Sequence, residues 1–321
     1  MKNTKDLDIS VIIATYNRDS VLGETLAYMV QMQRTGINSE FVVVDNNSTD
    51  KTRQIVEEFA EQLPIRYLFE AKPGQNCARN RALTQSQLGD IVAFTDDDVV
   101  PDKDWLQAIV STCRKWPNCG VFGGKIYVVW PGGQIPKWAR MPDIRSLAFA
   151  EHDYGRSECV YTAGAYPFSG NFWVRRRILA NAIKFDESIG WCPGNRILAT
   201  ETSLLRKLAD KGERFLYSPG AVVGHRVTSE QLSLKYLMSR AYSRGRGLAR
   251  LQQLCRKDLF QKHPLLWRLV RGGAIGRLGF SLAISLVPLV FNKPEKATLA
   301  MRRIGYNIES LKVAGGYYGA T

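Results

Sequence analysis

The sequence predicts an α/β protein built on a mostly parallel sheet flanked by helices, with a basic helical extension at its C-terminus. Short runs rich in Val and Ile recur at residues 9–14, 40–44, 65–69 and 91–94. Candidate helices lie between these runs, at residues 20–34, 50–62 and 75–87. Apolar runs of this length are typical of strands buried on both faces. Their alternation with helices implies parallel pairing through right-handed crossovers.

The second half of the chain is less regular. Residues 121–129 are predicted to form a strand, and the Pro- and Gly-rich stretch after it a loop reaching to about residue 141. A helix is expected over residues 200–211, because Gly212 follows it. Residues 214–227 contain two short apolar runs on either side of Pro219 and Gly220. From about residue 230 onward the pattern is helical and basic.

Composition and charge limit the possible classes of protein. With 321 residues, 45% of them hydrophobic and 23% charged, the chain can fold as one large globular domain or as two. The formal net charge of +14 is uneven, because residues 226–321 hold 17 of the 44 Lys and Arg but only 4 of the 30 Asp and Glu. This imbalance predicts an anionic partner for the C-terminal region: a membrane surface, a nucleic acid or a polyanionic substrate.

The six cysteines are scattered, and the five-residue gap between Cys113 and Cys119 matches no common zinc pattern. Residues 1–6 contain no apolar stretch of the signal-peptide type. These two features predict reduced thiols in a cytoplasmic chain.

Polar residues follow three of the predicted strands, where ligands bind to parallel sheets. Three adjacent aspartates repel one another, and a hard cation such as Mg²⁺ or Mn²⁺ would relieve that repulsion and also hold phosphates. Each polar group alone is equally typical of a helix cap or a solvated turn, but three together favour a nucleotide site. The groups are Thr15, Asn17 and Arg18 after the first strand, Asp45 after the second, and Asp96, Asp97 and Asp98 after the fourth.

Four segments in order resemble the family 2 glycosyltransferases, which have the Rossmann-like GT-A fold. Residues 10–18 are similar to the family's first strand and residues 42–50 to its second strand. Residues 74–82 resemble the helix after its third strand, and residues 94–98 its DXD motif. The resemblance extends over about residues 7–227.

The resemblance implies a role for each of these residues in binding a nucleotide-diphosphate sugar. Thr15, Asn17 and Arg18 would line the nucleotide pocket, and Asp45 would hold the base, commonly uracil. Asp96 and its neighbour Asp97 would contact the nucleotide, and Asp98 a divalent cation, Mn²⁺ or Mg²⁺, that stabilises the leaving diphosphate. Arg79 would add positive charge near the sugar or diphosphate; the alternative is an arginine on the helix surface. His225, after an apolar run, is either a metal ligand or a structural histidine.

The acceptor side also has matches. Residues 168–176 resemble the family's glycine–asparagine segment beside the donor sugar, which points to Gly170 and Asn171. Residues 194–204 resemble the segment that carries the general base, and they place Glu201 on its last acidic position, although Thr200 replaces the preceding acid. A carboxylate there would take the proton of an acceptor hydroxyl as it attacks, with inversion at the anomeric carbon. The alternative for Glu201 is an acid at a helix N-terminus.

The basic and apolar segments of the C-terminal region indicate contact with a membrane. Residues 232–254 are expected to form an amphipathic basic helix with recurring arginines. Residues 278–291, or 274–291 at most, are apolar but short for a membrane span, so we expect an interfacial or re-entrant helix. The alternative is a helical hairpin that covers the catalytic domain. Basic residues that would lie near lipid headgroups are Arg268, Arg271, Arg277, Lys293, Arg302 and Arg303.

We therefore predict a GT-A catalytic domain over residues 1–228, with a nucleotide-binding half (1–120) and an acceptor half (121–228), followed by a basic helical region over 229–321. The predicted activity is metal-dependent, inverting transfer of a sugar, from a UDP-type donor, to a glycan or lipid-linked acceptor at the cytoplasmic face of a membrane. One alternative is a nucleotidyltransferase, although residues 14–20 contain no glycine-rich loop with a lysine. The other is a non-enzymatic protein that binds membranes or nucleic acid; no nucleic-acid module is evident, so no nucleic-acid partner is expected.

Overall fold

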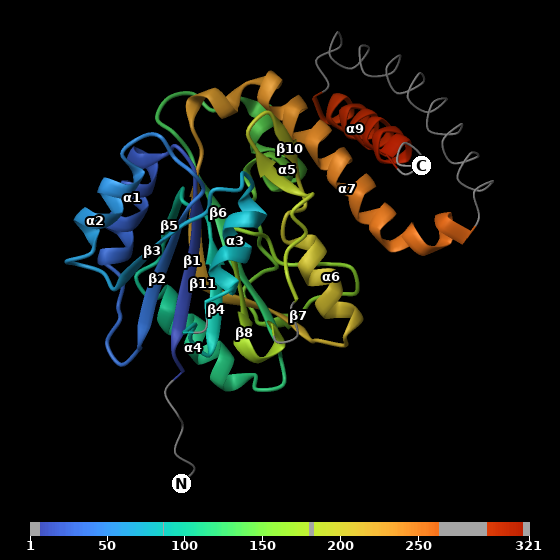
Figure 1. Ribbon diagram of the computed structural model, residues 1–321. Coiled ribbons are helices and arrows are strands. Elements are labelled where there is room, and N and C mark those ends of the chain that lie inside the picture. The colour runs from blue at the N-terminus through green and yellow to red at the C-terminus, as the bar shows by residue number, and fades with distance from the viewer. Residues whose placement is uncertain (1–6, 86, 180–182, 263–293, 317–321) are drawn as a thin grey trace. The chain divides into compact units, whose positions relative to one another are not determined.

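The computed structural model describes residues 7–85, 87–179, 183–262 and 294–316 (Figure 1). The chain divides into two compact units. The sheet unit comprises Met1–Trp130, Ala150–Glu187 and Glu201–Arg226, and the helical unit Pro131–Phe149, Ser188–Thr200 and Val227–Thr321. Each unit is described separately below.

A nine-stranded sheet forms the centre of the sheet unit over the described residues, in the order β3-β2-β1-β4-β8-β6-β11-β5, with β7 paired beside β11. Strands β1 to β4 pair in parallel, as do β6 and β11, whereas β5, β7 and β8 are antiparallel to their neighbours. The prediction of a mostly parallel sheet is confirmed. The strands are β1 Ile9–Thr15, β2 Ser39–Asp45, β3 Ile65–Phe69, β4 Ile91–Thr95, β5 Val99–Pro101, β6 Val121–Val129, β7 Cys159–Val160, β8 Asn171–Arg175 and β11 Phe215–Arg226.

Helices cover both faces of this sheet (Figure 1). On one face α1 (Asp19–Val30), α2 (Thr52–Phe59) and α4 (Trp105–Lys115) pack on a core that contains Val11, Ile13 and Phe122. On the other face α3 (Gln75–Leu83) and α6 (Thr202–Asp210) pack on Ile12, Val44 and Phe94. Alternate residues of a buried strand therefore supply two separate cores, which explains the unbroken apolar runs. A short 3₁₀-helix, η2 (Arg176–Leu179), follows β8.

Residues 215–226 form one strand, although the sequence predicts two runs interrupted by Pro219 and Gly220. The register of β11 against β6 shifts between Ser218 and Val222, so the two residues lie in a bulge. A bulge accommodates proline, which cannot donate to the strand ladder, without ending the strand. As a result β11 carries His225 to the same edge as the end of β4.

The helical unit is centred on two long helices, α7 (Leu234–Lys262) and α9 (Pro294–Gly316). They pack closely at two glycines: a Cβ on Gly245 would lie 1.8 Å from the Arg302 carbonyl oxygen, and one on Gly305 2.0 Å from that of Tyr242. The same unit contains α5 (Pro142–Phe149), β9 (Gly190–Cys192), β10 (Asn195–Ile197) and two 3₁₀-helices, η1 (Lys137–Arg140) and η3 (Ser229–Leu232).

The predicted basic helix over residues 232–254 corresponds to α7. None of the helices in the described ranges combines the length and the hydropathy needed to cross a bilayer. The apolar segment 274–291 lies outside the described residues, so its predicted membrane contact stays a prediction.

Candidate active site

The ends of β1, β2 and β4 bring their polar residues to one edge of the sheet unit. Asp45, at the end of β2, is buried and accepts the Tyr67 hydroxyl on Oδ2 at 2.7 Å and the Ser48 N–H on Oδ1 at 2.9 Å. Burial raises the pKa of the Tyr67 phenol, and Asp45 raises it further, so this hydroxyl remains a donor. The sequence did not indicate Tyr67, although strand β3 pairs with β2 beside Asp45.

Asn17 links the loops that follow β1 and β2. Its backbone N–H donates to Ser48 Oγ at 2.9 Å, and its Oδ1 accepts the Thr49 N–H at 2.7 Å. Asn17 and Asn47 adopt positive φ angles of 47° and 68°, a conformation that asparagine tolerates better than most residues. Asn17 therefore joins the loops that follow β1 and β2 next to Asp45.

Asp97 is bound on both oxygens by groups of β1 and its loop. Thr15 Oγ1 donates to Asp97 Oδ2 at 2.8 Å, and Arg18 donates to Asp97 Oδ1 at 2.5 Å. Burial raises the pKa of Asp97 to about 7, although Arg18 opposes this shift. Each carboxylate oxygen of Asp97 thus has one protein partner, and Asp97 anchors the first strand end to the aspartate cluster.

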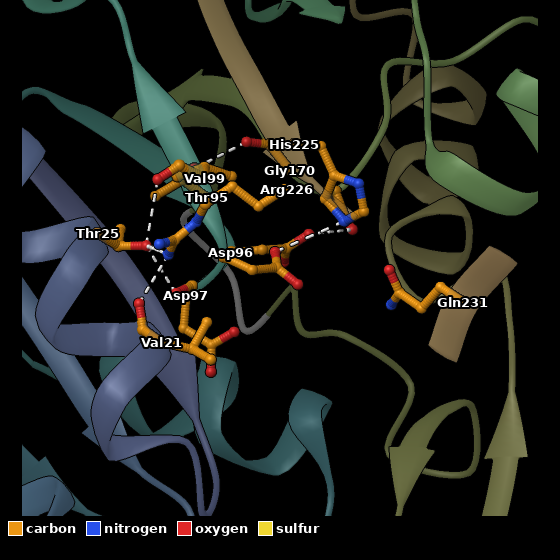
Figure 2. A network of polar contacts seen from close by, with 12 residues as sticks. Val21, Thr25, Thr95, Asp96, Asp97, Val99, Gly170, His225, Arg226 and Gln231 are labelled. Carbon is orange, nitrogen blue, oxygen red and sulfur yellow. Dashed lines mark hydrogen bonds and ion pairs between the residues drawn. The ribbon is translucent and has the colours of Figure 1, made fainter. Parts of the chain in front are cut away.

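Asp98 has one bound oxygen and one open oxygen. Arg18 donates to Oδ2 at 2.9 Å, whereas Oδ1 has no hydrogen-bond partner in the described part of the chain and faces His225 Nε2 at 3.6 Å. Figure 2 shows His225 beside the aspartates. Burial alone would raise the pKa of Asp98, but His225 and Arg18 outweigh it and hold the pKa below its usual value. A charged carboxylate with a free oxygen is suited to a cation.

Arg226 fixes the backbone around the aspartates (Figure 2). Its N–H donates to the Asp98 carbonyl oxygen at 3.0 Å, and its guanidinium donates to Thr25 Oγ1 at 2.6 Å and to the Val21 carbonyl oxygen at 2.7 Å. Thr25 Oγ1 in turn donates to the Asp97 carbonyl oxygen at 2.7 Å. The sequence did not indicate these contacts, because Arg226 lies 201 residues from Thr25.

Arg79 is buried beneath the site, with 1% of its surface exposed, so the interpretation as a surface arginine is wrong. Its Nη2 donates to Asp96 Oδ1 at 3.1 Å, whereas Nη1 has no hydrogen-bond partner within the described ranges. Burial lowers the pKa of Arg79, while the charges of Asp96 and Glu201 oppose that shift. Arg79 therefore interacts electrostatically with two of the predicted functional carboxylates, Asp96 and Glu201.

Gly170 lies next to Asp96, whereas the Asn171 side chain makes its hydrogen bonds elsewhere in the sheet unit. Thr95 Oγ1 donates to the Gly170 carbonyl oxygen at 2.8 Å, and a Cβ on Gly170 would lie 3.3 Å from Asp96 Oδ2. The Asn171 side chain is fully buried: it accepts from Trp105 Nε1 at 2.9 Å and donates to the carbonyl oxygens of Lys125 and Ala221. These contacts give Asn171 a role in the scaffold, and its contact with a sugar stays a prediction.

Glu201 occupies the N-cap position of α6 and is 8% exposed. Its carbonyl oxygen accepts the Leu205 N–H, the first helical hydrogen bond. An acid at this end of a helix is stabilised by the helix dipole. This position is compatible with a charged general base, which stays a prediction.

The described residues contain no group of three or more His, Cys, Asp and Glu side chains arranged to hold a metal ion. Asp98 and His225 nevertheless offer an open carboxylate oxygen and an imidazole that lie together. Mg²⁺ and Mn²⁺ in nucleotide enzymes commonly take one or two protein ligands and complete their shell with phosphate and water. The two residues present fit a cation that is shared with a diphosphate.

The model for "Glycosyl transferase family 2" matches residues 10–181 of this chain. The chain belongs to the family 2 glycosyltransferases. The probable glycosyltransferase YdaM of Bacillus subtilis (strain 168) is 26% identical over 227 residues, which are 69% of this chain and 51% of YdaM. The succinoglycan biosynthesis protein ExoM of Rhizobium meliloti (strain 1021) is 28% identical over 254 residues, which are 76% of this chain and 75% of ExoM. The matched region of this glycosyltransferase thus spans only about half of the first relative.

Two solved structures with similar folds contain bound donors. The mannosyltransferase PcManGT from Pyrobaculum calidifontis, in complex with GDP-Man and Mn²⁺, aligns with a TM-score of 0.59 at 19% identity and covers 96% of this chain and 88% of its own. Residues 1–349 of S. aureus TarS in complex with UDP-GlcNAc align with a TM-score of 0.54 at 20% identity, covering 97% and 92%. These similarities confirm the predicted GT-A fold.

Proposed function

We propose that this glycosyltransferase uses a divalent cation to transfer a sugar from a nucleotide-diphosphate donor, with inversion, to a hydroxyl group of a glycan or lipid-linked acceptor. The observation that most supports the proposal is the Oδ1 atom of Asp98, which has no hydrogen-bond partner among the described residues and faces His225. Both residues lie at the carboxyl ends of the parallel strands, where such sheets bind nucleotides. PcManGT in complex with GDP-Man and Mn²⁺ shares the fold and supports the cation. ExoM, a protein of succinoglycan biosynthesis, supports a polysaccharide as acceptor.

Asp45 is the proposed contact for the donor base. Its two oxygens already accept from Ser48 and Tyr67, and each carboxylate oxygen has a second lone pair for an N–H of the base. Uracil and guanine both present such an N–H, and the two structurally similar proteins bind UDP-GlcNAc and GDP-Man. We propose UDP because the family segment that residues 42–50 resemble commonly binds uracil.

The chain's own residues divide the chemistry between them. Asp96 and Asp97 would contact the nucleotide, with Arg18 and Thr15 fixing the orientation of Asp97. A cation held by Asp98 and His225 would supply positive charge to the departing diphosphate. The buried Arg79 would steady the donor side through Asp96, and its Nη1 is available for a sugar or phosphate oxygen. Glu201 would take the proton of the attacking hydroxyl.

A thermal-shift screen of sugar nucleotides tests the donor and the metal together. We expect a UDP-sugar to raise the melting temperature in the presence of Mn²⁺ or Mg²⁺ and to do so much less with EDTA. A larger shift with a GDP-sugar would correct the base, and no shift with any donor would contradict the proposal. Release of pyrophosphate rather than a nucleoside diphosphate would favour a nucleotidyltransferase.

We also propose that the enzyme acts as a peripheral protein at the cytoplasmic face of an anionic membrane. Arg302 and Arg303 are exposed on α9, which supports this idea. Arg246 and Arg250 contribute less, because both pair with Glu309. Co-sedimentation with phosphatidylserine vesicles, compared with neutral vesicles, tests the proposal, and equal recovery with both would contradict it.

A further inference from the structure

An aromatic cluster lies on β6 and β11, on the sheet face that carries the core containing Ile12 and Phe94. The ring of Tyr154 lies 5.0 Å from that of His152, 5.1 Å from that of Tyr161 and 5.5 Å from that of Tyr217. Tyr161 and Tyr217 are buried, whereas Tyr154 is 46% exposed. Gly123 of β6 leaves room for this cluster, since a Cβ there would lie 2.3 Å from the Tyr161 hydroxyl. The cluster therefore has a packed base and one exposed ring.

A charged pair borders the exposed ring. Lys125 Nζ lies 2.8 Å from Asp153 Oδ2, while the Tyr217 hydroxyl and the Gly155 N–H donate to Asp153 Oδ1 at 3.2 and 2.8 Å. Both side chains of the pair are partly exposed, at 35% and 40%. A carboxylate and an ammonium group thus lie beside the exposed ring of Tyr154. The buried rings of Tyr161 and Tyr217 pack against that ring and fix its position.

The cluster is continuous with the donor site through one short segment. The His152 ring lies 4.7 Å from the ring of Phe168. The next residue, Ser169, donates from its Oγ to Asp96 Oδ2 at 3.4 Å. Tyr154 is therefore separated from the donor-side carboxylate only by two aromatic rings and a serine.

A second exposed ring lies on the same face of β6. Tyr127 follows Lys125 by two residues, so both side chains project from one face of the strand. Tyr127 is 41% exposed and packs over Gly224, where a Cβ would lie 2.8 Å from its Cζ. Gly224 directly precedes His225, whose imidazole faces Asp98. Tyr127 thus extends the exposed aromatic surface along β6, next to the end of β11, where the adjacent His225 projects from the opposite face.

We propose that Tyr127, Tyr154 and the Lys125–Asp153 pair form a platform that binds a pyranose ring of the acceptor glycan. One face of a pyranose carries C–H groups, which pack against the negative face of an aromatic ring, and its edge carries hydroxyls that both donate and accept. The exposed tyrosine rings would contact the C–H groups of the pyranose, and the Lys125–Asp153 pair would bind its hydroxyls. The inference rests on the proposed function, because a glycan bound here would lead past Phe168 and Ser169 toward Asp96.

Fluorine NMR of the full chain labelled with 3-fluorotyrosine tests the platform directly. Cellotetraose and chitotetraose serve as probes, and Tyr→Phe variants assign the resonances. We expect the Tyr154 and Tyr127 resonances to shift saturably with at least one probe. Tyr28, which is 40% exposed on α1, is the matched control and should not move. If neither platform resonance moves more than that of Tyr28 with either probe, the proposal is overturned.

Substitution sharpens the test. Tyr154→Ala should weaken binding of the effective probe about tenfold, through loss of a stacking contact. Tyr154→Phe keeps the ring and should retain most of the affinity, and Tyr28→Ala should retain all of it. Equal affinity of Tyr154→Ala and Tyr28→Ala would also overturn the platform. Thermal shifts with sugar nucleotides separate the two ideas: probe binding without donor binding rejects only the proposed function, and the reverse rejects only the platform.

Discussion

Two groups of buried charge, one in each unit, differ in how completely they are paired. In the helical unit, Glu309 is fully buried and receives Arg246 on one carboxylate oxygen at 2.7 Å and Arg250 on the other at 2.5 Å. In the sheet unit, Asp98 and Arg79 are also buried, but each keeps one polar atom without a hydrogen-bond partner among the described residues. We call the Glu309 group closed, because both carboxylate oxygens are paired, and the Asp98 and Arg79 group open, because each residue has an atom unpaired within the described ranges.

The difference separates structural charge from functional charge. Leaving a buried polar atom unpaired costs stability, so the unpaired atoms of Asp98 and Arg79 are candidates for contact with a ligand. Both oxygens of Glu309 are bound within the chain, which suits a group that holds α7 against α9. Asp98 Oδ1 and Arg79 Nη1, the atoms without a partner in the described part of the chain, belong to the aspartate cluster at the carboxyl end of β4 and to the arginine that contacts it. A nucleotide diphosphate is expected to bind at this end of the sheet. The first two predictions below test this contrast, and the next two test charged groups outside both clusters.

The largest effect is expected at the open cluster. Asp98→Asn should lower the rate of sugar transfer about a thousandfold, because it removes the charge that would hold the cation. Steady-state release of the nucleoside diphosphate measures the rate, and circular dichroism checks that the variant is folded. Asp104→Asn, an exposed aspartate in the same region, is the control and should leave the rate unchanged. Equal rates for both variants would show that Asp98 has no such role.

The closed cluster should respond in stability. Glu309→Gln leaves two arginines without their counter-charge and should lower the free energy of unfolding by about 3–5 kcal/mol. Urea denaturation measures this loss. Glu295→Gln, on the exposed side of the same helix, provides the comparison and should change it little. A Glu309→Gln variant as stable as wild type would remove the distinction between the two clusters.

A smaller effect is expected at His152, a buried group beside the aromatic cluster. Burial lowers the pKa of His152 to about 4. The unfolded chain binds this proton near pH 6.5 and the folded chain only near pH 4, so stability is complete above pH 6.5 and falls between those values. The loss is at most about 3 kcal/mol. Denaturation at pH 7 and pH 4.5 should therefore show a steeper decline for wild type than for His152→Phe, and parallel declines would contradict the shift.

The smallest effect is expected for a charge pair open to solvent. Arg53 and Glu57 form an i,i+4 ion pair on α2, and both side chains are more than half exposed. Solvent screens such a pair, so Glu57→Gln should leave the denaturation midpoint unchanged within error. A clear loss would mean that exposure is a poor guide to the worth of a charge in this protein.

The sequence contained enough information to predict the sheet and the place of the site. The Val- and Ile-rich runs correspond to β1 to β4, and the polar residues after them meet at one edge because parallel strands share a direction. Arg79 was harder, since its helical position gave no sign that the α3 face around it would be buried.

Contacts across long stretches of sequence could not be predicted. Arg226 reaches Thr25, and Tyr67 reaches Asp45, only after the sheet has formed. The pairing of Arg246 with Glu309 likewise depends on the packing of α7 and α9. The sequence predicted an amphipathic basic helix here, whereas Arg246 and Arg250 share the single carboxylate of Glu309.

The interlocked glycines Gly245 and Gly305 have a consequence for any shortened form of the enzyme. The α7 and α9 backbones approach so closely at these points that a Cβ on either glycine would force the helices apart. A protein truncated before residue 294 would expose the α7 backbone around Gly245 and leave Arg246 and Arg250 without Glu309. Helix α9 is thus part of the packed structure of the helical unit, and we expect its removal to destabilise that unit.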